Sequence, residues 1–96
     1  MIIKVKGYLT YRDVIGKKEV LLPDDYPPTL REFLRDQAIE IGEPHSRSIY
    51  DEETGMVGEY VAVMLNGSHY RHLKNGLDTI LKDQDEIAIF PPGAGG

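Results

Sequence analysis

The chain has 96 residues, which suits one small domain, and its 41% hydrophobic and 28% charged residues are typical of soluble globular proteins. The formal net charge of −5 argues against general nucleic-acid binding, which needs a surplus of Lys and Arg. The absence of cysteine excludes disulfides, thiolate zinc sites, iron–sulfur clusters and thiol nucleophiles. No stretch approaches the roughly 20 apolar residues of a membrane span, and the N-terminus lacks a signal-peptide pattern. We therefore expect a cytoplasmic protein with neither nucleic acid nor membrane as a partner.

The N-terminal segment predicts an antiparallel hairpin. Apolar and polar residues alternate from position 3, with Leu9 as the last apolar member, as in a half-buried strand. Residues 12–17 supply the turn, in which Gly16 can take a positive φ. A second strand at 19–22 completes the hairpin.

One amphipathic helix follows. Thr29 and Glu32 have the spacing of a capping box, in which each side chain accepts a hydrogen bond from the backbone of the other residue. Gly42 is expected to end the helix as a left-handed cap. The apolar face consists of Leu30, Phe33, Leu34, Ala38 and Ile41. Such a face must cover a sheet, because an isolated helix of this length is marginal in water.

The second half of the chain predicts the remaining strands. Residues 43–59 are polar and long for a loop, so they hold either a short helical turn or a mobile segment. Residues 60–65 form a continuous apolar strand, typical of a central position, and the tight-turn dipeptide Asn66-Gly67 follows. A short edge segment at 68–73 and a last strand at 86–90 complete the sheet.

The predicted order is therefore strand, strand, helix, strand, short strand, strand. A single helix then crosses one face of a mixed sheet of four to five strands, and the first and last strands can pair in the middle. This is the β-grasp arrangement, of class α+β. We expect a β-grasp domain at 1–90 and a flexible tail at 91–96.

The tail carries the most informative residues. Phe90 anchors it to the last strand, and Pro91 and Pro92 favour an extended, stiff start. The end is nearly bare of side chains, and six extended residues reach roughly 20 Å. Such a tail can enter a narrow channel in a partner and present its terminal carboxylate there. Gly-rich ends are also often incidental, so an interaction module with no use for its tail stays an alternative.

The terminal carboxylate needs activation before it can react, because oxide is a poor leaving group. Adenylation by a partner that uses ATP would supply AMP as the leaving group. A sulfur donor could then convert Gly96 into a thiocarboxylate without any cysteine on the carrier. Gly96 is thus the candidate reacting residue, with no bound cofactor or metal, and the partners supply the catalytic groups.

Two stretches resemble a known family. Residues 81–96 show a leucine, a short acidic turn, an apolar strand, Phe-Pro-Pro and a terminal Gly-Gly, and residues 63–67 show a strand followed by an Asn turn. Together they resemble the MoaD-type small subunit of molybdopterin synthase and its MoaD/ThiS ubiquitin-like relatives. Two features depart from that pattern: Gln84 stands where the family usually has Gly, and the segment 43–59 is longer than in compact members.

The resemblance implies a ubiquitin-like fold, an E1-like enzyme that adenylates Gly96, and a sulfur donor. In the MoaD branch, the MoaE-type large subunit of molybdopterin synthase then receives the tail for synthesis of molybdenum or tungsten cofactor. The partner-binding residues would be Phe90, Pro91, Pro92, Gly93, Ala94 and Gly95. Similar tails serve thiamine synthesis and tRNA thiolation, and a ubiquitin-like modifier would instead join Gly96 to a lysine.

Other candidate sites are weaker. The pair His69 and His72 could suggest a metal, but no further ligand completes the set, so solvated histidines are favoured. The acidic residues 51–53 are interpreted as a solvated loop. The tyrosines at 8, 11, 60 and 70 are interpreted as cross-strand packing rather than as a base-stacking platform.

Overall fold

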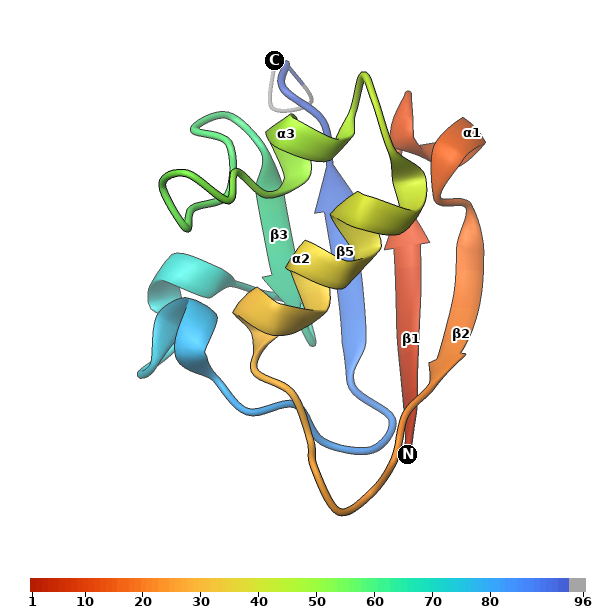
Figure 1. Cartoon of the computed structure of the whole chain (residues 1–96), viewed down its shortest axis with the longest axis vertical. Coiled ribbons are helices and arrows are strands. Elements are labelled where there is room, and N and C mark those ends of the chain that lie inside the picture. The colour runs from red at the N-terminus through yellow and green to blue at the C-terminus, as the bar shows by residue number, and fades with distance from the viewer. Residues whose placement is uncertain (94–96) are drawn as a thin grey trace.

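The computed structural model describes residues 1–93, which form a five-stranded mixed sheet with its main helix across one face (Figure 1). The strands lie side by side in the order β2-β1-β5-β3-β4. Their bounds are β1 (Ile2–Gly7), β2 (Lys17–Leu21), β3 (Ala62–Leu65), β4 (Ser68–His69) and β5 (Glu86–Phe90). The helices are α1 (Tyr11–Val14), α2 (Leu30–Ile41), α3 (Ser46–Ile49) and the 3₁₀ turns η1 (Tyr70–His72) and η2 (Gly76–Asp78).

The predicted β-grasp arrangement is confirmed. Strand β1 pairs antiparallel with β2 and parallel with β5, while β3 pairs antiparallel with both β5 and β4. The last strand of the chain is therefore the central strand of the sheet. It ends at the same end as β1, where α1 and α3 also lie (Figure 1).

The core lies between the sheet and α2. Along β1 and β5 every second side chain is buried, because successive side chains of a strand point to opposite faces. The apolar face of α2 covers this side of the sheet, as predicted, although Ile41 is only half-buried. The fully buried large side chains include Ile3, Leu30, Leu34, Leu81, Ile87 and Ile89.

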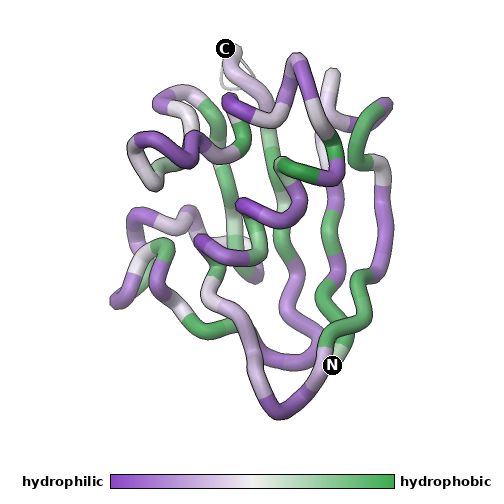
Figure 2. Tube along the Cα trace, viewed as in Figure 1, coloured by the Kyte–Doolittle hydropathy of each residue, from purple (hydrophilic) through white to green (hydrophobic). Residues whose placement is uncertain are grey.

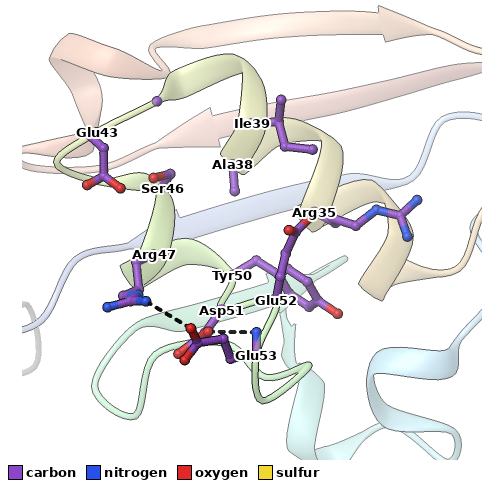
Figure 3. A pocket seen from close by; sticks show the side chains of 11 residues that line it. Arg35, Ala38, Ile39, Glu43, Ser46, Arg47, Tyr50, Asp51, Glu52 and Glu53 are labelled. Atoms are coloured by element: carbon purple, nitrogen blue, oxygen red, sulfur yellow. Dashed lines mark hydrogen bonds and ion pairs between the residues drawn. The ribbon is translucent and has the colours of Figure 1, made fainter.

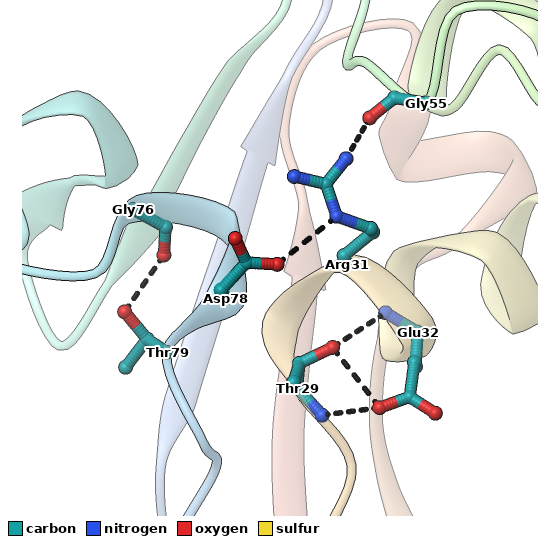
Figure 4. A network of polar contacts seen from close by, with 7 residues as sticks. All are labelled: Thr29, Arg31, Glu32, Gly55, Gly76, Asp78 and Thr79. Carbon is teal, nitrogen blue, oxygen red and sulfur yellow. Dashed lines mark hydrogen bonds and ion pairs between the residues drawn. The ribbon is translucent and has the colours of Figure 1, made fainter.

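The capping box of α2 is confirmed. The Thr29 hydroxyl accepts a hydrogen bond from the Glu32 backbone N–H at 3.2 Å, and the Glu32 carboxylate accepts from the Thr29 N–H at 3.1 Å (Figure 4). Gly42 takes the positive φ of 74° expected of a glycine, but its ψ of −176° lies outside the left-handed helical region. Gly42 therefore does not form the predicted left-handed cap, because its ψ is that of extended backbone.

The hairpin connection differs from the predicted simple turn. Strand β1 ends at Gly7, and Leu9 is exposed with a φ of 54°, so its assignment to the alternating strand was wrong. The short helix α1 then packs against the end of the strand, with Tyr11 in the core. A Cβ on Gly7 would lie 2.4 Å from the Tyr11 carbonyl oxygen, so only glycine permits this close approach.

The segment 43–59 contains the short helical turn α3, one of the two predicted alternatives. Ile49, Tyr50 and Val57 are buried in the same core as the sheet. The Arg31 side chain joins this segment to η2, because its guanidinium donates to the Gly55 carbonyl and pairs with Asp78 at 3.2 Å (Figure 4). The long loop is thus a packed part of the domain.

The third strand is shorter and less central than predicted. It begins at Ala62, because Tyr60 is exposed, and it is the second strand from the edge. The Asn66-Gly67 turn is confirmed by positive φ values of 51° and 86°. The predicted edge segment reduces to the two residues of β4, followed by η1.

Among residues 1–93, no helix combines the length and the apolarity that a bilayer crossing requires.

Candidate functional site

The base of the tail is built on an aromatic stack. Phe90, the last residue of β5, stacks on Tyr8 with ring centroids 4.3 Å apart and an interplanar angle of 11°. The parallel register that pairs Gly7 with Ile89 places these two rings beside each other, and the Tyr8 N–H donates to the Ile89 carbonyl at 3.0 Å. The predicted anchoring role of Phe90 thus has a physical basis in β1, the strand next to it.

A lysine completes this stack. The Lys6 ammonium lies 4.8 Å from the centroid of the Tyr8 ring, within the range of a cation–π contact. Sequence reasoning missed both Lys6 and the Tyr8–Phe90 pair as parts of the site. The alternation of Lys4 and Lys6 with buried residues was the available signal, since it places both lysines on the face opposite the helix.

The first tail residues are only partly as predicted. Pro91 is buried, so packing continues one residue past the last strand. Pro92 and Gly93 are exposed and form a turn, in which Gly93 has a φ of 87°. Pro92 thus lies in a turn, which contradicts the extended start predicted from the two prolines, and the positive φ of Gly93 changes the direction of the backbone. Ala94, Gly95 and Gly96, including the predicted reacting residue, lie outside the described residues.

The face of the sheet opposite α2 is open and carries a shallow groove of about 840 Å³. Its floor combines half-buried apolar side chains with lysine side chains on one side. The residues that line this open-face groove include Lys4, Lys6, Tyr8, Met64, Ala88 and Phe90, together with Lys17, Glu19 and Glu86. The groove therefore reaches the residue from which the tail departs.

The start of β5 is held by a polar network at the other end of the strand. The Asn66 amide donates to the Asp85 carboxylate at 2.9 Å and accepts from the Glu86 N–H at 2.8 Å. Asp85 also accepts from the Lys82 N–H at 2.8 Å. Gln84, the departure from the family pattern, has a φ of 71°, which explains why a glycine suits this position. Strand β5 is thus fixed at its first residue as well as at Phe90.

A second, smaller pocket of about 360 Å³ lies between α2, α3 and the acidic loop at 51–53 (Figure 3). Within it, Asp51 accepts a hydrogen bond from the Glu53 N–H at 2.9 Å, and Glu53 pairs with Arg47 at 3.6 Å. The acidic residues thus bond within their own turn and to a neighbouring arginine. This agrees with the interpretation of a solvated loop.

The histidine pair has a local structural role. The Nδ1 of His69 accepts from the Arg71 N–H at 3.1 Å and so caps η1, while the His69 and His72 rings lie 5.9 Å apart. Burial lowers the pKa of His69, and the nearby charges of Arg71 and His72 lower it further. Within residues 1–93 no group of three or more His, Asp or Glu side chains is placed to hold a metal ion.

The predicted interpretation of the four tyrosines is right for Tyr8 and wrong for the other three. Tyr8 stacks on Phe90 of β5, as predicted. Tyr11 belongs to α1 and is buried in the core, Tyr60 is 73% exposed before β3 begins, and Tyr70 lies in η1. Alternation along the sequence cannot show where a strand stops, so residues just outside the strands were assigned to them.

Comparisons with known proteins agree with this architecture. The ThiS family model matches residues 8–96. Small archaeal modifier protein 3 of Haloferax volcanii is 34% identical over 96 residues, and the match covers 100% of both chains.

Solved structures give the same result. The small archaeal modifier protein 1 from Methanosarcina acetivorans is 30% identical, with a TM-score of 0.70 over 99% of this chain and 96% of that chain. A putative molybdopterin converting factor subunit 1 from Pyrococcus furiosus is 26% identical, with a TM-score of 0.54 over 95% of this chain and 97% of that chain.

These relatives support the wider family and not the molybdopterin branch in particular, since two of the three are named as modifiers. The family match begins just after β1 and extends through the Gly-Gly end, and the 34% identity extends over all 96 residues. The chain therefore belongs to the ThiS family of ubiquitin-like small sulfur carriers and modifiers.

Proposed function

We propose that this protein is a sulfur carrier and that the carboxylate of Gly96 is the group that reacts. One observation carries the proposal: the family match runs through residue 96, and the tail follows the central strand of the sheet. Phe90 is held from both sides of its strand end, by the stack on Tyr8 and by the buried Pro91. The domain thus provides a fixed point from which a slim chain end extends.

The proposed chemistry takes place on the chain end and uses groups of the partners. The Gly96 carboxylate attacks the α-phosphorus of ATP in an E1-like enzyme, which gives an acyl-adenylate and pyrophosphate. A sulfur donor at the hydrosulfide level then attacks the acyl carbon and displaces AMP, with loss of a proton. The product is a thiocarboxylate, and its sulfur needs no cysteine on this chain.

The open-face groove is the proposed docking surface for the activating enzyme. Met64, Ala88 and Phe90 offer apolar contact. Lys6 and Lys17, which pair across β1 and β2, add positive charge beside it, whereas Lys4 lies between Glu19 and Glu86. A surface of this kind suits a partner patch with an apolar centre and an acidic border. Pro92 and Gly93 follow shortly after Phe90, which lines the groove, so a partner that covers the groove lies next to the start of the tail.

A second candidate function is protein modification. The relative at 34% identity is named as a modifier, and activation of Gly96 would be the same first step. A target lysine would then displace AMP and form an isopeptide bond. The two functions share the carrier and differ only in the nucleophile.

Within sulfur transfer, the molybdopterin branch is the proposed destination. The similarity to a putative molybdopterin converting factor subunit 1 favours it, and the resemblance at residues 81–96 agrees. A MoaE-type large subunit would then be the partner that accepts the charged tail. Thiamine synthesis and tRNA thiolation are the alternative destinations for the same thiocarboxylate.

The first test is whether the activating enzyme recognises the tail. We expect the full chain to support ATP–pyrophosphate exchange with its E1-like enzyme, and a chain that lacks Gly95-Gly96 to support none. The Lys74→Ala variant is the matched control, because Lys74 is exposed between η1 and η2 and does not line the groove. Exchange that persists in the truncated chain would contradict the proposal.

The second test separates the two functions in cells. Affinity-tagged protein should carry a thiocarboxylate if it is a sulfur carrier, and ladders of larger conjugates should appear if it is a modifier. Deletion of the gene should abolish molybdenum-enzyme activity if the molybdopterin branch is correct. Intact molybdenum-enzyme activity with lost thiamine synthesis or tRNA thiolation would move the proposal to those pathways.

A further inference from the structure

Strand β2 forms an unpaired edge of the sheet, along the β1–β2 hairpin. The bonds from the Gly7 N–H to the Gly16 carbonyl and from the Leu22 N–H to the Met1 carbonyl, both 2.8 Å, flank the β1–β2 ladder. Residues of an antiparallel ladder alternate in the direction of their backbone groups. Lys18 and Val20 therefore bond towards β1, while Lys17, Glu19 and Leu21 direct their N–H and C=O groups away from the sheet.

These outward groups have no partner within residues 1–93. No backbone hydrogen bond beyond the β1 ladder involves Lys17, Glu19 or Leu21. The Leu21 side chain is also 79% exposed. The opposite edge differs, because β4 has only two residues before η1 begins. Strand β2 is thus the edge with room for an added strand.

The edge hairpin is basic in an acidic protein. Residues 1–22 hold five Lys and Arg against two Asp and Glu, a formal charge of +3, whereas the whole chain has −5. Figure 2 shows the hydrophilic stretch along β2 (purple). The register pairs Lys6 with Lys17, Lys4 with Glu19 and Ile2 with Leu21, so the side chains of Lys17, Glu19 and Leu21 lie on the open face of the sheet. Lys18 lies on the other face, where its ammonium pairs with Glu40 of α2 at 3.6 Å.

The charge of β2 determines which kind of segment can pair with this edge. A second copy of β2 would bring its own Lys17 and Lys18 against the same basic strand, and edge lysines are a common protection against such self-pairing. A segment with an acidic residue opposite Lys17 has the complementary charge, whereas Lys18 already pairs with Glu40. An apolar residue four positions from an acidic one would contact Leu21 while the acidic residue contacts Lys17.

We propose that the β2 edge binds an extended acidic segment of a partner protein by strand addition. The outward backbone groups of Lys17, Glu19 and Leu21 supply the main-chain hydrogen bonds. Lys17 selects an acidic side chain, and Leu21 selects an apolar one. This site does not use the tail, so it stands or falls independently of the reaction at Gly96.

The test uses the peptide acetyl-Thr-Val-Val-Thr-Asp-Asp-Thr-amide, with a control peptide that has Lys at both Asp positions. In amide NMR spectra of the full chain, we expect the acidic peptide to shift the signals of residues 17–21. We expect it to bind about tenfold more tightly than the basic peptide, because an attractive cross-strand charge pair at Lys17 takes the place of a repulsive one. Equal binding, or shifts centred on Met64 and Ala88, would overturn the proposal.

A pair of variants tests strand addition itself. Glu19→Pro removes only an outward N–H, whereas Glu19→Thr loses the same carboxylate and keeps the N–H. We expect Glu19→Thr to bind the acidic peptide as the original chain does, and Glu19→Pro to show no binding although its core signals stay in place. Binding that persists in Glu19→Pro would contradict the proposal.

Charge reversal and self-association complete the test. Lys17→Glu should reverse the preference between the two peptides, so that the basic peptide binds more tightly than the acidic one. This variant tests the proposal even if Glu19→Pro does not fold. Sedimentation of the chain alone should show a monomer. A dimer that Glu19→Pro disrupts and Glu19→Thr preserves would identify a second copy as the occupant and would contradict the acidic partner.

Discussion

One face of β5 packs in the core and stabilises the fold, whereas the other face is available to a partner. Ile87 and Ile89 are almost fully buried against α2, whereas Ala88 and Phe90 are half-buried on the open face. The strand needs all four residues to hold its register, but only the open-face pair is available to a partner. A domain this small keeps a thin core on one side of the sheet and leaves the other side for binding.

The largest expected effect is on the core side. Ile89→Ala removes a fully buried side chain and should lower the free energy of unfolding by about 3 kcal/mol. Urea denaturation of the variant measures this loss. If the two faces differ as described, the fraction that stays folded should still be adenylated normally. An unchanged unfolding midpoint would show that Ile89 is not part of the core.

On the same strand, Phe90→Ala should lower the rate of adenylation strongly and the stability of the fold only slightly. Loss of the stack with Tyr8 should cost only about 1–2 kcal/mol of stability, because Phe90 is half-buried. The rate of adenylation at low carrier concentration should fall at least about tenfold, because an apolar anchor of the docking surface is lost. Phe90→Leu is the matched control and should recover part of the rate. A normal rate in Phe90→Ala would remove this residue from the docking surface.

The turn before β5 allows a stabilising change. Gln84 has a φ of 71°, where a residue with a Cβ is strained and glycine is not. Gln84→Gly should therefore raise the free energy of unfolding by about 0.5–1 kcal/mol, since the relief of strain exceeds the entropy cost of glycine. Neither face of the sheet changes, so adenylation should stay the same. A loss of stability in thermal or urea unfolding would contradict this reading of the turn.

The smallest effect is a pH dependence in the same turn. A hydrogen bond from the Ile2 N–H at 2.7 Å lowers the pKa of the exposed Asp83 carboxyl. A carboxyl with a lowered folded-state pKa stabilises the fold above its unfolded pKa and loses that contribution as pH falls through the folded value. Stability should thus decrease slightly below about pH 4. Asp83→Asn keeps an acceptor but cannot titrate, so this part of the pH dependence should disappear in urea unfolding curves.

Local patterns explain which parts of the fold were predictable. The capping box at Thr29 and Glu32 and the turn at Asn66-Gly67 depend on neighbours in the sequence, so their chemistry is visible there. The end of β1 was not visible, since alternation continues to Leu9 although the chain turns after Gly7. The reason is a tertiary contact, the close approach of Gly7 to Tyr11.

The same limit applies to the candidate site. The tail and Phe90 were identified from composition and position, because bare glycines after two prolines are visible in one segment. The stack of Phe90 on Tyr8 joins residues at opposite ends of the chain and depends on the parallel register of β1 and β5. The packing of 43–59 depends likewise on Arg31, which reaches Gly55 from α2.

The mass of the C-terminal peptide tests the central claim most directly. The full chain would be incubated with its E1-like enzyme, ATP and a sulfide source, then digested and weighed. The account predicts a gain of about 16 Da, oxygen replaced by sulfur, on the peptide that ends at Gly96, and only when ATP is present. A peptide that keeps its mass although the enzyme consumes ATP in the presence of this chain would contradict the account.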